Sequence, residues 1–498
     1  MTAWPTHPVV HEVNTWVWLR ELSRREGHPL TLATVPGAAW DDLALPGVDA
    51  VWLMGVWERS PAGLAVAMAD DELLATFRAA LPALRPDDVV GSPYCVRRYV
   101  ADEHLGGPAA LAAARTELAA RGVRLILDYV PNHVAPDHPW VLDRPEVFIG
   151  GSADDLSSSP AAYLEAGGHV LARGRDPYFA PWPDVVQLNA FSEGMRAATV
   201  DVLRDIGDQC DGVRCDMAML LLNDVFAKTW GDHAGPAPAD EFWPYVLGRV
   251  RARHPDMLFV AEAYWDLEWT LQQHGFDYCY DKRLYDRLVG EGARSVRDHL
   301  RAEPGYQEHL VRFLENHDEP RAAATLGPQP RERAAAVTIA TLPGLTLWHE
   351  GQLDGRQVRV PVFLAERPDE PADADLRRFH TDLLAAVSSS GMRTGNWLLL
   401  ECTGWPDNPT CRNLVAWTWE HESGRYVVVA NLSPEQSSAR VALPWSDLQG
   451  RATRLTDLLG GQVYDQDGDE VVSQGLFVAL PPWGHHVLAV DEAATGRA

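Results

Sequence analysis

Eight short apolar runs, largely β-branched, alternate with alanine- and leucine-rich stretches of helical periodicity from residue 11 to about residue 390. The runs are VHEVNTWVWL, VDAVWLMG, VRLILDYV, GVRCDMAM, MLFVAEAY, GFDYCYD, HLVRFLEN and LTLWHEG. Such runs are typical of strands buried on both faces of a parallel sheet. Eight strand–helix units predict an α/β fold, a (β/α)8 TIM barrel, in which functional residues lie in the loops after the strands.

Two insertions interrupt this alternation, at 57–99 after the second run and at 134–189 after the third. The second insertion is rich in Gly, Ser, Pro and aromatic residues, and a loop of that length is normally functional or a small subdomain. From residue 391 short strands separated by turn signals replace the helical pattern, which predicts an antiparallel β-sandwich. We therefore expect three parts. A (β/α)8 barrel domain at 1–390 would carry any catalytic residues, a subdomain at 134–189 is inserted into it, and a β-sandwich follows at 391–492.

The composition excludes several classes of partner. A net charge of −27 disfavours nucleic acid and anionic membranes, because both require a basic surface. The first residues lack the basic and apolar segments of a signal peptide, and no apolar stretch approaches the ~20 residues that span a bilayer. We expect a cytoplasmic protein; the oligomeric state is left open. The six cysteines show no metal-binding spacing, although Cys402 and Cys411 are close enough for a local disulfide.

Polar segments follow four of the predicted strands: DYVPNH, GVRCD, AEAYW and ENHDEPR. They bring a set of carboxylates, an arginine and a histidine to strand ends, namely Asp128, Arg214, Asp216, Glu262, His317 and Asp318. Three carboxylates near one another, with such partners, are what acetal chemistry on a sugar requires.

Two of these carboxylates have neighbours that should change their pKa. Arg214 and Asp216 lie two residues apart on one strand face, where a cation should lower the pKa of the carboxyl and keep it ionised; a structural salt bridge is the alternative. Glu262 is followed by Tyr264 and Trp265, and apolar surroundings raise a carboxyl pKa, as a general acid needs. A glutamate that caps the next helix is the alternative there.

The order, residue types and separations of these segments resemble the α-amylase family, glycoside hydrolase family 13, over about the first four fifths of the chain. The resemblance implies that Asp216 is the nucleophile, Glu262 the acid/base and Asp318 the third catalytic carboxylate, which helps to distort the sugar ring. It also implies that Arg214 orients Asp216 and is paired with Asp128. The insertion at 134–189 corresponds to the family's domain B, here short.

The resemblance extends to substrate binding. It implies that His133 and His317 bind hydroxyls of the sugar at the cleavage point, and that Tyr94 in GSPYCVRRY stacks under this sugar. Arg321 and Trp265 are further candidates, and the outer sites could use other aromatic residues, namely Trp57, Tyr178 and Trp182.

The chain departs from the family pattern at three places. Arg98 stands where an aspartate is usual, Gly91 where many exo-acting relatives have an aspartate, and MAMLLL where amylases often have a Lys-His pair after the nucleophile. That pair contributes to a calcium site, so we expect no cofactor and no essential calcium. We expect hydrolysis of α-glucosidic bonds in oligosaccharides or α-glucans, with a preference for short substrates.

Other activities fit the same residues. A transglycosidase or a sugar phosphorylase of the family would differ only in the acceptor. Two remoter alternatives are a Schiff-base aldolase barrel using Lys282, whose neighbours Asp281 and Asp286 raise its pKa, and a non-catalytic carbohydrate-binding protein.

Overall fold

The computed structural model describes residues 3–327 and 329–492. Its centre is a closed barrel of eight strands in the order β1-β14-β13-β12-β11-β10-β5-β2, all neighbours parallel. The strands are β1 (Val9–Asn14), β2 (Ala50–Met54), β5 (Arg124–Tyr129), β10 (Gly212–Cys215), β11 (Leu258–Ala261), β12 (Tyr278–Tyr280), β13 (Leu310–Arg312) and β14 (Leu345–His349). Each lies in its predicted run, apart from Val9 at the start of β1, so the predicted (β/α)8 barrel is confirmed.

The first run is longer in sequence than its strand. β1 ends at Asn14, and the segment TWVWL begins helix α1 (Thr15–Glu26), so the predicted strand over these residues is wrong. The Asn14 side chain accepts a hydrogen bond from the backbone N–H of Val17 and caps the helix. Local β propensity of bulky and branched residues is therefore overridden by the cap and by burial of one helical face.

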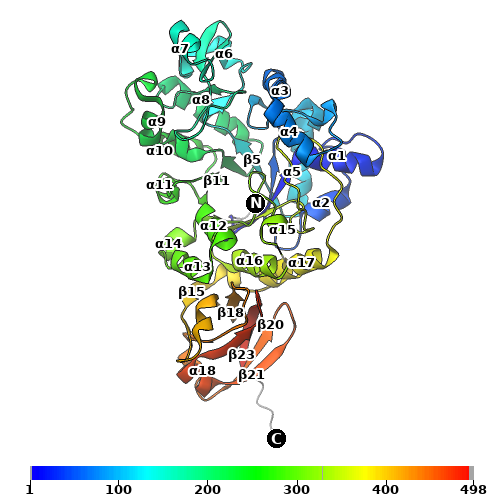
Figure 1. Ribbon diagram of the computed structural model, residues 1–498, viewed down its shortest axis with the longest axis vertical. Coiled ribbons are helices and arrows are strands. Elements are labelled where there is room, and N and C mark those ends of the chain that lie inside the picture. Colours follow the sequence, from blue (N-terminus) through cyan, green and yellow to red (C-terminus); the bar gives the residue numbers. More distant parts are fainter. Residues whose placement is uncertain (1–2, 328, 493–498) are drawn as a thin grey trace.

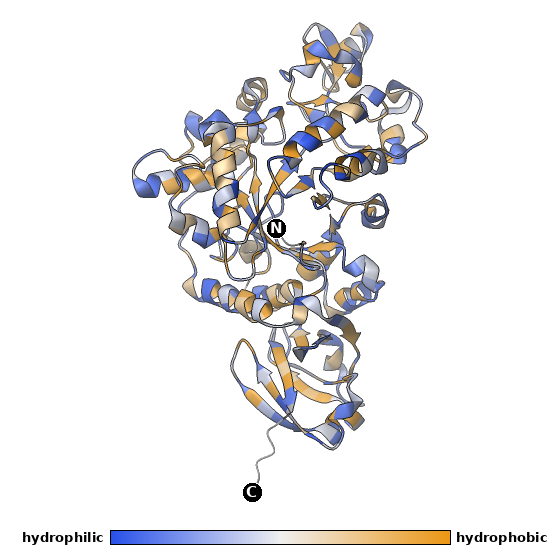
Figure 2. Ribbon diagram, turned by 180° about the vertical axis from the view of Figure 1, so that it is seen from behind, coloured by the Kyte–Doolittle hydropathy of each residue, from blue (hydrophilic) through white to orange (hydrophobic). Residues whose placement is uncertain are grey.

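Helices surround the barrel on the outside, and the apolar strands lie within (Figures 1 and 2). The main ones are α5 (Gly107–Ala120), α8 (Glu193–Gly207), α10 (Phe242–Arg251), α12 (Lys282–Gly290), α16 (Gln329–Thr341) and α17 (Ala374–Ser389). Among the described residues no helix is both long and apolar enough to cross a membrane.

Both insertions contain secondary structure. The first pairs β3 (Trp57–Arg59) with β4 (Val96–Ala101) and carries α3 (Pro61–Met68) and α4 (Asp71–Ala80). The second has its own elements, which Figure 1 shows at the end of the molecule opposite the C-terminal sheets: β6 (His133–Val134), α6 (Trp140–Asp143), α7 (Ala153–Ser158), β7 (Tyr163–Ala166), β8 (His169–Ala172) and β9 (Val186–Gln187).

The root of this second insertion is held by buried amides. β6 pairs antiparallel with β9, and the Gln187 Nε2 donates to both the backbone and the side-chain oxygen of Asn132, at 2.9 Å each. Because His133 follows Asn132 directly, the same bonds fix the backbone that carries this histidine.

The C-terminal part consists of two antiparallel sheets. Six strands form one sheet in the order β15-β17-β18-β23-β20-β21, and three form the other, β16-β19-β22. Their bounds are β15 (Asn396–Leu400), β16 (Cys402–Thr403), β17 (Leu414–His421), β18 (Gly424–Asn431), β19 (Ser437–Val441), β20 (Ala452–Asp457), β21 (Val463–Asp467), β22 (Leu476–Leu480) and β23 (His485–Glu492). The short helix α18 (Gly468–Gln474) between β21 and β22 was not predicted. All six cysteines are free, so Cys402 and Cys411 form no disulfide.

The larger sheet packs on the barrel. The indole N–H groups of Trp417 and Trp419 both donate to the backbone oxygen of Thr341, the last residue of α16, at 3.1 and 2.7 Å. Both indoles belong to the same apolar cluster as the barrel helices, whereas a second cluster fills the space between the two sheets.

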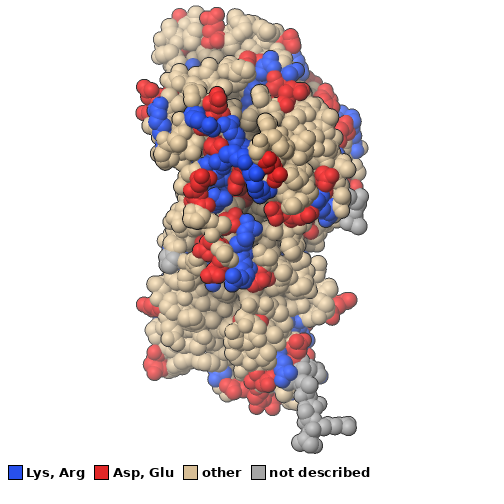
Figure 3. Space-filling view, turned by 90° about the vertical axis from the view of Figure 1, so that its right-hand side faces the viewer, with Lys and Arg blue, Asp and Glu red and all other residues tan. Residues whose placement is uncertain are grey.

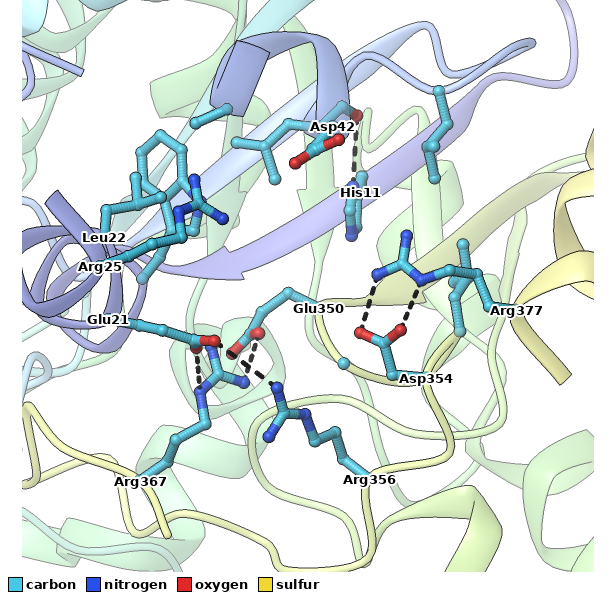
Figure 4. Close-up of a pocket in the computed structure, with 16 residues that line it drawn as sticks. His11, Glu21, Leu22, Arg25, Asp42, Glu350, Asp354, Arg356, Arg367 and Arg377 are labelled. Carbon is cyan, nitrogen blue, oxygen red and sulfur yellow. Dashed lines mark hydrogen bonds and ion pairs between the residues drawn. The ribbon is translucent and has the colours of Figure 1, made fainter. Parts of the chain in front are cut away.

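A polar pocket lies where the last barrel loop meets the first two helices, α1 and α2 (Gly37–Leu43) (Figure 4). Its arginines are paired with carboxylates: Arg367 lies 2.7 Å from Glu350, and Arg377 contacts both oxygens of Asp354. Figure 3 likewise shows basic and acidic side chains intermixed on one face. These pairs hold the loop after β14 against the barrel.

Candidate active site

Arg214 organises the carboxyl ends of the barrel strands. It lies on β10 and is 1% exposed. Its Nη1 is 2.9 Å from Asp216 Oδ1, and its Nη2 is 2.7 Å from Glu262 Oε2. The guanidinium also lies over the rings of Trp52, Tyr94 and Tyr280, at 5.3–5.7 Å from their centroids. One buried cation therefore fixes two carboxylates from neighbouring strands.

Asp128 lies beneath this pair at the end of β5. Its Oδ1 is 3.6 Å from Arg214 Nη1, and its Oδ2 accepts hydrogen bonds from the Trp52 indole and the Gly55 backbone N–H. Burial raises the pKa of Asp128 to about 6. The structure thus brings Asp128 to Arg214, as expected, and gives it the place of a supporting residue.

The ionisation of Asp216 depends on the neighbouring Glu262 as well as on Arg214. Burial and the neighbouring Glu262 carboxylate raise the pKa of Asp216 well above its usual range, although Arg214 acts in the opposite direction. The prediction that Arg214 gives Asp216 a lowered pKa is therefore wrong, because desolvation and like charge outweigh the single cation. Near neutral pH this cluster holds a proton, which an acid–base reaction can use.

Glu262 is fixed by two further contacts. Besides Arg214, its Oε2 accepts from the backbone N–H of Met217 at 2.7 Å, and its Oε1 accepts from the Tyr264 hydroxyl at 2.9 Å. Met217 directly follows Asp216 and adopts a left-handed conformation, with φ of 42°. The strained turn after β10 therefore aims one backbone donor at Glu262.

The histidine of the ENHDEPR segment forms a second chain of polar contacts. The Nε2 of His317 is 2.7 Å from the Tyr94 hydroxyl and 2.9 Å from Asp318 Oδ2, and its Nδ1 is 2.5 Å from Glu12 Oε1. Burial opposes it, but Asp318 and Glu12 raise the pKa of His317 well above its usual range. Desolvation would raise the pKa of Asp318, but His317 and Arg214 lower it to about 2. A cationic His317 and an ionised Asp318 follow.

A hollow opens above these residues, with a cavity volume of about 350 Å³. That size suits a small-molecule site. Six of the predicted site residues line it, namely Tyr94, His133, Trp182, Asp216, Glu262 and Asp318. Burial lowers the pKa of His133 to about 4, which leaves a neutral imidazole, and Trp182 packs against its ring at 5.0 Å. The hollow is therefore acidic on its floor and aromatic at its sides.

Other predicted residues lie elsewhere. Arg321 is 2% exposed and does not reach the hollow, because its Nη1 is bound by Glu315 Oε1 at 2.6 Å and by the Glu350 backbone oxygen at 2.8 Å. Trp57 is also buried, and its indole donates to the Asp128 backbone oxygen. Trp265 lines a second, adjacent hollow, with the exposed Tyr178 against its edge at 4.8 Å.

The sequence reasoning missed Glu12, which binds His317 from β1 and is fully buried. A signal was present, because a charged residue in the middle of the apolar run VHEVN is costly unless it has a partner. Nothing local could identify that partner, which lies 305 positions away. Within the described ranges no group of three or more His, Cys, Asp or Glu residues is arranged to hold a metal ion.

Comparisons with known proteins bear on this geometry. No family model matches the chain. An α-amylase, MalA, from Haloarcula japonica is 26% identical over 94% of the chain, and an α-1,4-glucan:maltose-1-phosphate maltosyltransferase from Streptomyces coelicolor is 28% identical over 46%. The chain spans about 60% of the length of the first relative and 29% of the second.

The solved structure of an α-amylase from H. orenii shares the fold. It superposes with a TM-score of 0.70 at 17% identity, over 98% of this chain and all of the other. The barrel, the two C-terminal sheets, the strand-end segments and the relatives agree with one another, and the chain is similar to proteins of the α-amylase family, glycoside hydrolase family 13.

Proposed function

We propose that this protein hydrolyses α-glucosidic bonds of oligosaccharides or α-glucans with retention of configuration. The observation that carries the proposal is the double contact of Arg214 with Asp216 and Glu262 at the floor of one hollow. Two carboxyls held side by side on a single cation suit a reaction in which one attacks carbon while the other transfers a proton.

In the first step the proton of Glu262 passes to the glycosidic oxygen as Asp216 attacks the anomeric carbon. Arg214 engages Oδ1 of Asp216, which leaves Oδ2 for the new bond. The C–O bond to the leaving group breaks and a glycosyl ester of Asp216 forms. Glu262 then takes a proton from water, whose oxygen attacks the same carbon and releases Asp216.

The sugar at the cleavage point would lie over Tyr94, with His133 as a donor to its hydroxyls, while the cationic His317 holds Tyr94 and Asp318 in place. Asp318, held ionised by His317, would accept from hydroxyls of the same ring. These roles require the ring to enter between the acidic floor and the aromatic wall. Positive charge that develops on the ring then meets the ionised Asp318.

A transglycosidase is the second candidate, supported by the maltosyltransferase among the relatives. The aldolase alternative has less support, because Lys282 is engaged in ion pairs with Asp286 at 2.5 Å and Glu319 at 3.4 Å. We also propose a cytoplasmic location, for which the free cysteines are the support.

The stereochemistry of the first product tests the proposal. Proton NMR during cleavage of maltotriose should show the α-anomer first, followed by slow mutarotation. A β-anomer as first product, or no cleavage of any α-glucoside, would contradict the retaining mechanism.

A further inference from the structure

The polar pocket beside helices α1 and α2, drawn in Figure 4, is separate from the catalytic hollow and shares no described lining residue with it. Its volume is about 150 Å³, and a cavity of roughly this size holds one six-membered ring. His11 of β1 lines this pocket, whereas the next residue, Glu12, binds His317. Because successive side chains of a strand point to opposite faces, the pocket lies on the outer face of β1, and we call it the outer pocket.

His11 is the group in the outer pocket whose hydrogen bonding is incomplete. It is 6% exposed, and its Nδ1 lies 3.2 Å from the backbone oxygen of Leu43. Since a carbonyl oxygen only accepts, Nδ1 carries the hydrogen. Burial lowers the pKa of His11, although the Leu43 carbonyl and Glu350 act in the opposite direction, so the ring is neutral near pH 7. Nε2 is then an acceptor without a donor among the described residues, and Figure 4 shows it facing the open centre of the pocket.

Paired charges form walls around this acceptor, as Figure 4 shows. Arg367 lies 2.8 Å from Glu21 and 2.7 Å from Glu350. Arg377 contacts both oxygens of Asp354, at 2.5 and 2.9 Å. Each pair fixes guanidinium donors and carboxylate acceptors at the edge of the same space. A ligand in the outer pocket therefore needs both donors and acceptors of its own.

The charges of the outer pocket are balanced. Four arginines and four carboxylates line it. An anion such as phosphate would compete with Glu350 and Asp354 for arginines that are already paired. A metal ion is not favoured either, because the described ranges hold no group of three or more His, Cys, Asp or Glu residues arranged for one. The balance favours a neutral ligand.

Apolar side chains complete the lining. Trp18 and Leu22 come from α1, and Leu45 follows the end of α2. Apolar surface beside a few fixed polar groups is the pattern of sites that bind small neutral molecules. A pyranose matches it, because its ring faces carry C–H groups and each hydroxyl both donates and accepts. The charged ends of a zwitterion would gain nothing from the apolar part.

From these observations we propose that the outer pocket is a binding site for a monosaccharide in its pyranose form, in which a sugar hydroxyl donates to Nε2 of His11. The paired arginines and carboxylates bind the remaining hydroxyls, and Trp18 with the leucines contacts the ring. This site goes beyond the function proposed above and does not depend on it, because the sugar binds here whether or not the catalytic hollow cleaves an α-glucoside.

Equilibrium dialysis of radiolabelled D-glucose against the full-length protein tests the proposal. Leu45→Trp fills part of the outer pocket, so the wild type should bind one more glucose per chain than this variant, whatever binds in the catalytic hollow. Leu142→Trp, the same change at a position that is 69% exposed on α6, is the matched control and should bind as the wild type does. His11→Phe keeps a ring but removes the acceptor, and should weaken binding at this site about 10-fold or more.

Inorganic phosphate and L-serine are dialysed in the same way and should show no binding that Leu45→Trp removes. Circular dichroism melts establish that each variant is folded, and Leu45→Trp decides the test if His11→Phe is not. Four results would overturn the proposal: equal glucose binding by the wild type and Leu45→Trp, an equal loss in Leu142→Trp, full affinity in a folded His11→Phe, or phosphate or serine in the outer pocket in place of glucose.

Discussion

The imidazole of His317 on the loop after β13 lies 2.5 Å from the carboxylate of Glu12 on β1. This contact joins the first strand of the barrel to the seventh and holds the ring that also touches Tyr94 and Asp318. Glu12 itself does not line the hollow, so it acts on a substrate only through His317.

We predict that Glu12→Gln lowers kcat/KM by about 10- to 100-fold, because a charge-assisted hydrogen bond is lost. The folded-state pKa of His317 is raised, so the stability from its charge is fully present below about pH 6.5, declines above that and vanishes above the raised pKa. The Tm deficit of the variant should therefore shrink with rising pH in calorimetry. A deficit that grows with pH would contradict this assignment.

For the nucleophile, we predict that Asp216→Asn lowers turnover roughly 1000-fold or more, since an amide cannot form the glycosyl ester. Folding should be intact, because burial already disfavours the charged form of Asp216. Initial rates on maltotriose and the Tm measure the two effects. A variant that keeps most of its activity would remove Asp216 from the mechanism.

Glu332 on α16 offers a test of stability away from the site. It is 1% exposed, and burial together with Glu315 and Asp373 raises its pKa to about 8. Since the folded pKa exceeds the unfolded one, stability falls as the pH rises from about 4.5 to about 8. Glu332→Gln should therefore stabilise the protein by about 2–4 kcal/mol above pH 8 and by little near pH 5. Denaturant titrations at both pH values check this, with the exposed Glu72→Gln as control.

We predict that a chelator does not abolish activity. Calcium needs six or more oxygen ligands, and the segment after Asp216 supplies only apolar side chains. The nearby Asn132 uses its side chain on Gln187. Activity assays with EDTA, and then with added calcium, test this prediction. A loss of activity that calcium alone restores would refute it.

Short substrates should be preferred to starch. The two insertions and the exposed aromatic residues Tyr178 and Phe179 lie near the mouth and favour a pocket over an open cleft. Catalytic efficiency on maltose and maltotriose should exceed that on soluble starch per accessible bond. Products of mid-chain cleavage, with starch the better substrate, would contradict the pocket.

The barrel and its strand-end residues were predictable because they depend on local patterns. Apolar runs locate the strands, and each polar segment follows one, so Asp216 and Glu262 could be placed at the same edge of the barrel. The segment TWVWL was assigned wrongly because its helix depends on a cap at Asn14 and on packing. Glu12 was missed, and Arg321 was assigned to the substrate site, for a different reason: their partners come from other loops, and neighbouring residues carry no information about such pairs.

The two tryptophans that share the Thr341 oxygen make the C-terminal sheets part of the barrel's folding unit. Their rings complete the apolar cluster that also contains the inner residues of α16. Cutting the chain near residue 390 would leave that helix with an apolar face in water and a carbonyl without donors. The β-strands after residue 391 are therefore not a detachable module, and heat should melt both parts together in a single cooperative transition.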